Sequence, residues 1–134
     1  MTIVTRAHDP PAVPAPIGGY SQGLEVPAGA RLLFISGQIP VRTDGSVPAD
    51  FAGQCDLVWD HIMAVLASAG MGPEHLVKVT TFLAGRDHAD TNSRIRRERL
   101  GAARPALTVL IAEIFAPEWL LEIEAVAACG GAAG

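Results

Sequence analysis

Apolar residues along the chain follow two spacings, one typical of helices and one typical of strands. The helical spacing is clearest over residues 50–69, where the apolar side chains recur every three or four positions and form one stripe: Phe51, Cys55, Val58, Trp59, Ile62, Met63 and Leu66. Asp50 is the expected N-cap and Gly70 the expected stop. The stripe therefore predicts an amphipathic helix that buries one face.

Five other segments have strand-like composition: 20–26, 31–40 with an end at Gly37, 77–84, about 106–114, and 119–128. A second and more polar helix is predicted over residues 87–101, opened by Asp87 and closed by Gly101. The order is ββ-α-β-α-ββ. It predicts an α+β fold in which residues 1–134 form a single domain of one sheet and two helices.

The strand at 106–114 points to self-association. Leu107, Val109 and Ile111 alternate with Thr108, Leu110 and Ala112, so both faces of this strand are largely apolar. Two helices cover only one face of such a sheet. Charged residues make up 18% of the chain, against roughly 25% in a typical soluble domain, and the mean hydropathy is +0.30. We expect a homo-oligomer whose subunits cover each other's open sheet faces.

Several classes of function lack their sequence signals. The net charge of −4 predicts no nucleic-acid or acidic-membrane partner, and no run reaches the roughly 18 apolar residues of a membrane span. The four histidines and the two cysteines, Cys55 and Cys129, show no metal-ligand spacing, and no nucleotide-binding or G-x-S-x-G motif occurs. We expect no metal, no cofactor, reduced thiols, a cytoplasmic location, and flexible tails at 1–16 and 129–134.

A few polar residues remain open to two interpretations. The run RIRRER at 94–99 is either a solvated helix face with subunit salt bridges or an anion or RNA surface. His88 and Asn92 lie one helical turn apart and form either a surface pair or part of a site. Glu122, in an otherwise apolar strand, either faces solvent or is partly buried. Hydroxyls such as those of Tyr20 and Ser36 are more often structural than catalytic.

Six motifs, in order, resemble those of the RidA/YjgF family, also called the L-PSP endoribonuclease-like or reactive-intermediate deaminase family. They are GGYSQG, ISGQIP, VPADFAGQ, LVKVTTFLA, RPA and LEIEAVA, and they extend from Gly18 to Ala128. The resemblance implies a chorismate-mutase-like subunit, a homotrimer with a barrel-like core and three intersubunit clefts, and cofactor-free hydrolytic deamination of small imines or enamines.

The resemblance also implies roles for single residues. Tyr20 matches the tyrosine of G-x-Y-x-Q-G, and Ser36 with Gly37 matches the serine-glycine pair of the second strand. Asn92 matches the pocket asparagine of the second helix. Glu122 matches the glutamate that holds the water attacking the imine carbon.

Two departures from the family pattern change the expected chemistry. The family's P-A-R-S/T reads P-A-L-T over residues 105–108, so Leu107 replaces the arginine that clamps the substrate carboxylate. Arg104 does not stand in, because an odd offset along a strand directs its side chain to the opposite face. His88 occupies a position that is usually aromatic, where it could act as a base or a cationic anchor.

These residues leave three hypotheses. In the first, Glu122, helped by His88, hydrolyses a non-standard imine or enamine that is positioned by Tyr20, Asn92 and groups near Ser36, Gly37, Leu107 and Thr108. In the second, the same clefts bind a small molecule without turnover. In the third, the protein is a ribonuclease or translation inhibitor, which the acidic charge and the missing arginine oppose. Ordinary 2-imino acids are expected to be poor substrates.

Overall fold

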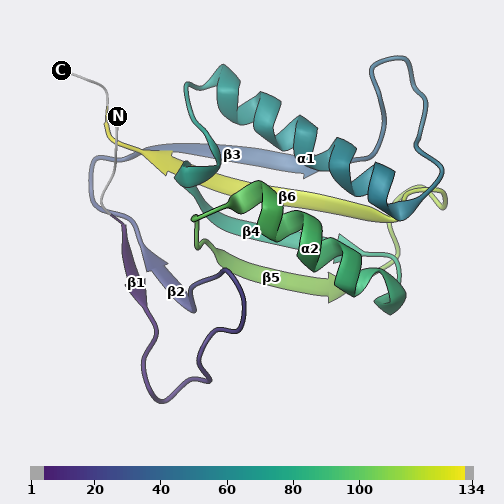
Figure 1. Ribbon diagram of the computed structural model, residues 1–134. Helices are drawn as coiled ribbons and strands as arrows, with labels where there is room; N and C mark the ends of the chain where they lie inside the picture. The colour runs from purple at the N-terminus through teal and green to yellow at the C-terminus, as the bar shows by residue number, and fades with distance from the viewer. Residues whose placement is uncertain (1–4, 132–134) are drawn as a thin grey trace.

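A mixed sheet of four strands carries two helices on one face in the computed structural model, which describes residues 5–131 (Figure 1). The strands lie in the order β3-β6-β4-β5 and comprise β3 (Arg31–Gln38), β4 (Leu76–Leu83), β5 (Ala106–Ile111) and β6 (Leu121–Cys129). β6 runs antiparallel to both of its neighbours, whereas β4 and β5 are parallel because a helix crosses between them. The α+β prediction is confirmed.

The longer helix, α1 (Phe51–Ser68), forms as its apolar stripe predicts. Asp50 caps it, since its carboxylate accepts a hydrogen bond of 2.9 Å from the backbone N–H of Gly53. Gly70 follows the last turn with a φ of +72°, a conformation that glycine adopts without strain. The predicted cap and stop are both confirmed.

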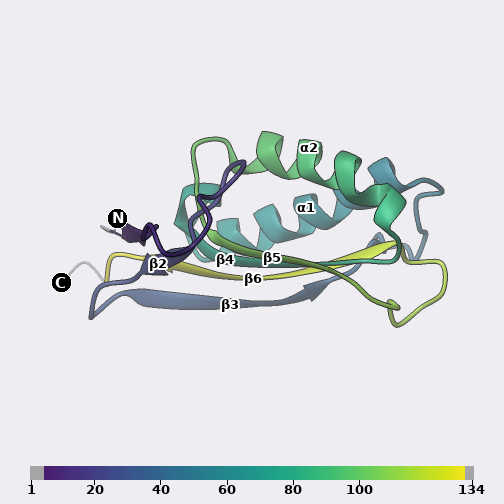
Figure 2. The same cartoon turned by 90° about the horizontal axis from the view of Figure 1, so that it is seen from below.

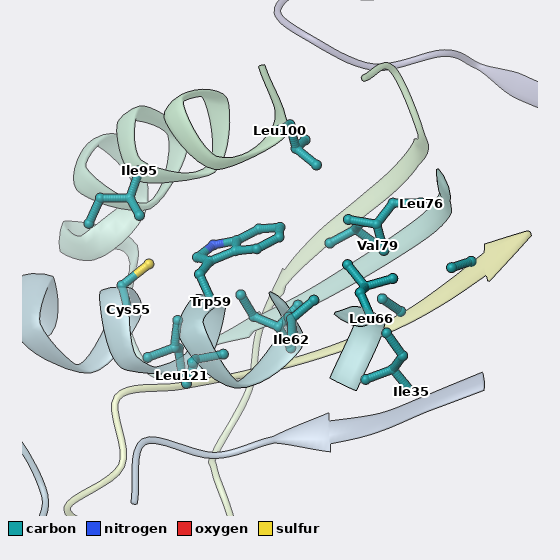
Figure 3. Close-up of a cluster of buried hydrophobic side chains, with 14 of the residues drawn as sticks. Ile35, Cys55, Trp59, Ile62, Leu66, Leu76, Val79, Ile95, Leu100 and Leu121 are labelled. Carbon is teal, nitrogen blue, oxygen red and sulfur yellow. The ribbon is translucent and has the colours of Figure 1, made fainter. Parts of the chain in front are cut away.

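The stripe of α1 forms the core against the sheet (Figure 3). Trp59, Ile62 and Leu66 are completely buried, and they pack with inward side chains of β4 and β6 such as Val79 and Ile123. Burial in this apolar layer raises the pKa of the Cys55 thiol to about 12. The thiol therefore stays protonated at neutral pH.

The second helix begins differently from the prediction. A 3₁₀ turn, η2 (Arg86–His88), precedes the α-helix α2 (Ala89–Leu100), and the N-cap residue His88 makes no side-chain capping bond. Asp87 therefore does not open α2 as expected, because it lies within the 3₁₀ turn. Gly101 ends the helix with a φ of +58°, as predicted. A second 3₁₀ turn, η1 (Pro73–His75), precedes β4.

The first expected strand does not belong to the four-stranded sheet. It is shortened to β2 (Gly23–Glu25), which pairs with β1 (Arg6–His8) in a separate two-stranded ribbon. β1 lies within the segment expected to be a tail, whereas residues 1–4 and 132–134 of the expected tails lie outside the described residues. Ser21 joins the ribbon to the sheet, because its N–H donates to the Pro105 carbonyl and its hydroxyl donates to the Arg104 carbonyl.

The last two strands are also shorter than predicted, at the C-terminal end of β5 and at the N-terminal end of β6. β5 ends at Ile111, and β6 begins only at Leu121. The chain leaves β5 after the Ala112 N–H donates to the Leu83 carbonyl, and a turn closes where the Trp119 N–H donates to the Ala116 carbonyl. The intervening loop places residues 113–115 beside the outer face of the sheet.

Both helices lie on the same side of the sheet, and the opposite face is open (Figure 2). Large apolar side chains point from this outer face into solvent: Phe34 is 74% exposed and Leu32 is 53% exposed. The prediction that the helices cover only one face is confirmed. Apolar side chains exposed side by side on one surface are typical of a protein–protein interface.

We predict that Asp50→Ala destabilises the chain by about 1 kcal/mol, because the Gly53 N–H loses its only side-chain acceptor at the helix start. Asp50→Asn should retain most of the stability, since asparagine caps equally well. Urea unfolding at one fixed protomer concentration measures both variants. Equal losses in the two variants would contradict a capping role.

Candidate functional site

Glu122 and Gly37 lie against each other on the outer face of the sheet. A bulge in β3 between Ile35 and Gln38 breaks the regular pairing with β6 and includes Ser36 and Gly37. A β-carbon added at Gly37 would fall only 2.8 Å from the carboxyl carbon of Glu122 and would overlap its oxygen. Gly37 therefore leaves the space that the Glu122 carboxylate occupies.

A shallow pocket with an empty volume of about 450 Å³ opens beside Glu122. Its lining combines carboxylates and large apolar groups: Phe82, Glu113, Ile114, Phe115, Glu122 and Glu124. Phe115 is almost fully exposed at the mouth. Three glutamates line this pocket, and sequence reasoning identified only Glu122 as part of a site. Glu113 and Phe115 follow an apolar run and carry no motif, so no local signal singles them out.

Two further candidates, Ser36 and Thr108, also lie on the outer face. Ser36 lines a neighbouring pocket together with Lys78, Thr80 and Glu124. The ammonium of Lys78 donates a hydrogen bond of 2.7 Å to the Thr108 hydroxyl. The outer face therefore brings Ser36, Gly37, Thr108 and Glu122 into one polar region of an otherwise apolar surface.

Asn92 and Tyr20 belong to the opposite side of the sheet. Asn92 lies on α2 with 1% of its surface exposed, and its side-chain oxygen has no hydrogen-bond partner. Tyr20 is half-buried and lies near the Arg96 guanidinium of the same helix. Both side chains are thus associated with α2, away from Glu122.

Leu107 lies on the helix side as well. In the register of β5 with β4 it is paired with the buried Val79, and its side chain packs against the hydrophobic core. Thr108, the next residue, points to the other face. Leu107 thus has a packing role at the edge of the sheet.

His88 uses its ring as an aromatic surface. The imidazole stacks on Phe51 with ring centres 4.4 Å apart and planes inclined by 5°. Its Nε2 lies 4.0 Å from the Asp87 carboxylate. This stacking fits a position that is usually aromatic in the family, and it covers one face of the imidazole.

The predicted site residues therefore form two groups on opposite faces of the sheet. Ser36, Gly37, Thr108 and Glu122 lie on the outer face, whereas Tyr20, His88, Asn92 and Leu107 lie on the helix side. A single chain does not bring the two groups together. Among residues 5–131, no cluster of three or more potential ligands could hold a metal ion, and no helix has the length and apolarity to cross a membrane.

We predict that Gly37→Ala costs about 1–3 kcal/mol, because the added methyl group forces the Glu122 side chain or the β3 bulge to move. In a Glu122→Ala background the same substitution should cost much less, since the overlapping carboxylate is gone. A double-mutant cycle from urea unfolding measures this coupling. Additive effects would show that the two residues do not restrain each other.

Comparisons with known proteins agree with this fold. The family model described as Endoribonuclease L-PSP matches residues 11–129. A RutC family protein from Pyrococcus horikoshii is 33% identical over 116 residues, which cover 85% of this chain and 90% of that protein. The 2-iminobutanoate/2-iminopropanoate deaminase of Escherichia coli K12 is 33% identical over 118 residues, with 85% and 90% covered.

A solved structure of a family member also has this fold. The Rid family protein YyfB from Yersinia pestis superimposes with a TM-score of 0.81 at 26% identity, covering 93% of this chain and 98% of that one. The family match spans most of the chain, and the fold agrees over nearly its whole length. The chain belongs to the Rid family, the group that also carries the names YjgF and L-PSP endoribonuclease.

Proposed function

We propose that the chain forms a homotrimer that hydrolyses a small imine or enamine in clefts between its subunits. The observation that supports this most directly is the Glu122 carboxylate, seated over Gly37 in an open pocket on an uncovered sheet face. A second copy packed on that face would bring its own residues to Glu122. Such an arrangement would join the two groups of candidate residues that one chain keeps apart.

In the proposed reaction, Glu122 accepts a proton from a water molecule as the water oxygen bonds to the imine carbon. The imine nitrogen takes up a proton, which gives a tetrahedral carbinolamine. The carbon–nitrogen bond then breaks, ammonia leaves, and the carbon becomes a carbonyl. Water and imine thus yield ammonia and a ketone or oxo acid, with no change of oxidation state.

The other candidates position the ligand in this proposal. Tyr20 and Asn92 supply hydrogen-bonding groups from the helix side, and the backbone near Ser36, Gly37 and Thr108 does so from the strands. His88 either assists proton transfer through its free ring edge or packs against the ligand as an aromatic group. Orientation of the reactants by such groups accounts for a large part of the rate of many enzymes.

Leu107 makes ordinary 2-imino acids poor substrates in this proposal. Removing one partner of a buried charge pair costs about 2–5 kcal/mol, and each 1.4 kcal/mol is about tenfold in binding. Turnover of 2-iminobutanoate should therefore be about 30-fold to a few thousand-fold below that of relatives with an arginine at this position. The same substitution favours the second candidate function, a trimer that binds a small molecule without turning it over.

We predict that Leu107→Arg raises ammonia release from freshly generated 2-iminobutanoate by at least about tenfold, because it returns a guanidinium to β5. Val109→Arg is the matched control, since it adds the same group two residues along the same face of the same strand. A coupled ammonia assay measures all three proteins.

Two results would contradict the enzymatic proposal. Wild-type turnover as fast as in the Escherichia coli relative would mean that Leu107 does not limit the reaction. If Glu122→Gln hydrolyses an imine as fast as the wild-type protein does, Glu122 has no part in the mechanism. A protein that binds imines but releases no ammonia would support the non-catalytic candidate.

We also predict that Phe34→Asp dissociates the trimer, because it replaces a large exposed apolar side chain of the uncovered sheet face with a charge. Val13→Asp, which charges an exposed apolar position in the N-terminal segment, should leave the assembly intact. Sedimentation velocity gives the number of copies in each protein. A wild-type protein that sediments as a monomer would exclude a site built between subunits.

A further inference from the structure

The exposed arginines of α2 differ in their partners. Arg94 forms an ion pair with Glu98, and Arg99 forms ion pairs with two aspartates of α1. Arg97 is also exposed, but it forms no ion pair with any carboxylate of the described residues. A solvated helix face with salt bridges therefore accounts for Arg94 and Arg99 and leaves Arg97 unexplained.

Arg97 and Arg104 line the same pocket on the helix side of the protein. This pocket has an empty volume of about 660 Å³, and its lining contains two guanidinium groups, three glycines and no carboxylate: Gly18, Gly19, Arg97, Leu100, Gly101, Ala103 and Arg104. Arg104, like Arg97, has no ion pair among residues 5–131. The pocket is therefore locally positive in a chain whose net charge is −4, and it attracts anions.

Two adjacent glycines bring both guanidinium groups close to one stretch of backbone. A β-carbon added at Gly18 would fall 2.6 Å from a terminal nitrogen of Arg97, and one added at Gly19 would fall 3.5 Å from Nη1 of Arg104. Gly18 also has a φ of +83°, which glycine adopts without strain. The two guanidinium groups therefore border one peptide unit, and the absence of side chains there keeps the pocket open.

Most of the hydrogen-bond donors of these two arginines are unused. Nη1 of Arg104 donates to the carbonyls of Gly101 and Ala103 at 2.9 Å each, which holds this guanidinium in place and offsets the negative end of α2. Nε and Nη2 of Arg104 make no hydrogen bond among the described residues, and neither does the guanidinium of Arg97. Compensation of the helix end therefore explains one nitrogen of Arg104 and no donor of Arg97.

Arg96 adds a third positive charge near the pocket, although it does not line it. Its side chain is buried and forms no ion pair among the described residues. Burial lowers the pKa of the Arg96 guanidinium, and the positive charge of Arg97 lowers it further. The charges of the two neighbouring arginines therefore repel each other, and an anion beside Arg97 would reduce that repulsion.

We propose that the pocket between Arg97 and Arg104 binds the phosphate group of a small molecule. A phosphate dianion matches the charge of two guanidinium groups, and its tetrahedral oxygens accept hydrogen bonds from two segments of the chain at once. A carboxylate has one charge and two oxygens, so it suits a single guanidinium. The ligand is free phosphate or a phosphate ester whose organic part contacts Leu100 and Ala103.

This site is separate from the proposed imine hydrolysis. The pocket shares no lining residue with the one beside Glu122, and neither arginine is among the groups assigned to that reaction. The inference therefore goes beyond the proposed function and does not rest on it. Phosphate binding and imine turnover are measured separately, so either result stands if the other fails.

NMR titration of the ¹⁵N-labelled full chain tests the site with inorganic phosphate, phenyl phosphate and acetate. The ionic strength is held constant, because salt screens exposed charges. The backbone amide signals of Gly18 and Gly19 should shift and saturate with at least one of the two phosphates, in the millimolar range or below. Acetate should bind at least about tenfold more weakly. Tighter binding of phenyl phosphate than of inorganic phosphate would identify an ester as the ligand, and the reverse would identify the free ion.

Four variants locate the site. Arg97→Met and Arg104→Met should each weaken phosphate binding by about tenfold or more, because each removes charge-assisted hydrogen bonds. Arg94→Met is the matched control, since it removes an exposed arginine of the same helix that pairs with Glu98, and its affinity should equal that of the wild type. Gly19→Leu keeps every charge but fills the pocket, so it should also abolish binding.

Thermal unfolding and sedimentation velocity separate a lost site from a lost fold. Phosphate should raise the Tm of the wild type and of Arg94→Met but not that of Arg97→Met. If Gly19→Leu does not fold, the two arginine variants still decide the question.

Four results would overturn the inference. The first is that neither phosphate shifts the two glycine signals, and the second is that acetate binds as tightly as phosphate. The third is that a folded Gly19→Leu keeps the wild-type affinity, since diffuse charge and not the pocket would then attract the anion. The fourth is that Arg97→Met dissociates the oligomer, because a carboxylate of another copy would then be the partner of Arg97.

Discussion

The structure depends on the coverage of one sheet face and not the other. The two helices bury inward side chains of β4 and β6 such as Val79 and Ile123, and Trp59 on α1 is itself completely buried in that layer. The outer face keeps Phe34 and Leu32 in solvent. A sheet with an open apolar face gains free energy when it packs against another surface. In this chain the candidate acid–base group, Glu122, lies on that same face.

The sheet also separates the candidate residues in a way that follows from strand geometry. Leu107 and Thr108 are neighbours in sequence but point to opposite faces, because side chains alternate along β5. Glu122 shares the face of Thr108, whereas Asn92 belongs to the helix layer. In the proposed trimer, a small ligand that contacts both sets lies between two subunits. The proposed trimer therefore links assembly and chemistry through the same strand.

Spacing in the sequence was enough to predict the two helices, the four main strands and the cap at Asp50, because those features depend on local periodicity. It could not predict that β2 pairs with β1, since this pairing is set by contacts through Ser21 to the distant Arg104 and Pro105. Family resemblance selected Gly37 and Glu122, but only the three-dimensional structure shows that a side chain at position 37 would overlap the Glu122 carboxylate. Glu113 joins Glu122 through a loop that carries no sequence motif.

Arg96 shows that the arginines of one basic run on a helix can divide between the surface and the interior of the protein. The run RIRRER is open to two interpretations from the sequence, a solvated helix face with salt bridges or an anion or RNA surface. Arg94 and Arg99 fit the first through their ion pairs. Arg96 points inward instead, and helical periodicity alone places it one turn after Asn92. Natural proteins stay only marginally stable, so an unpaired buried cation is a considerable cost.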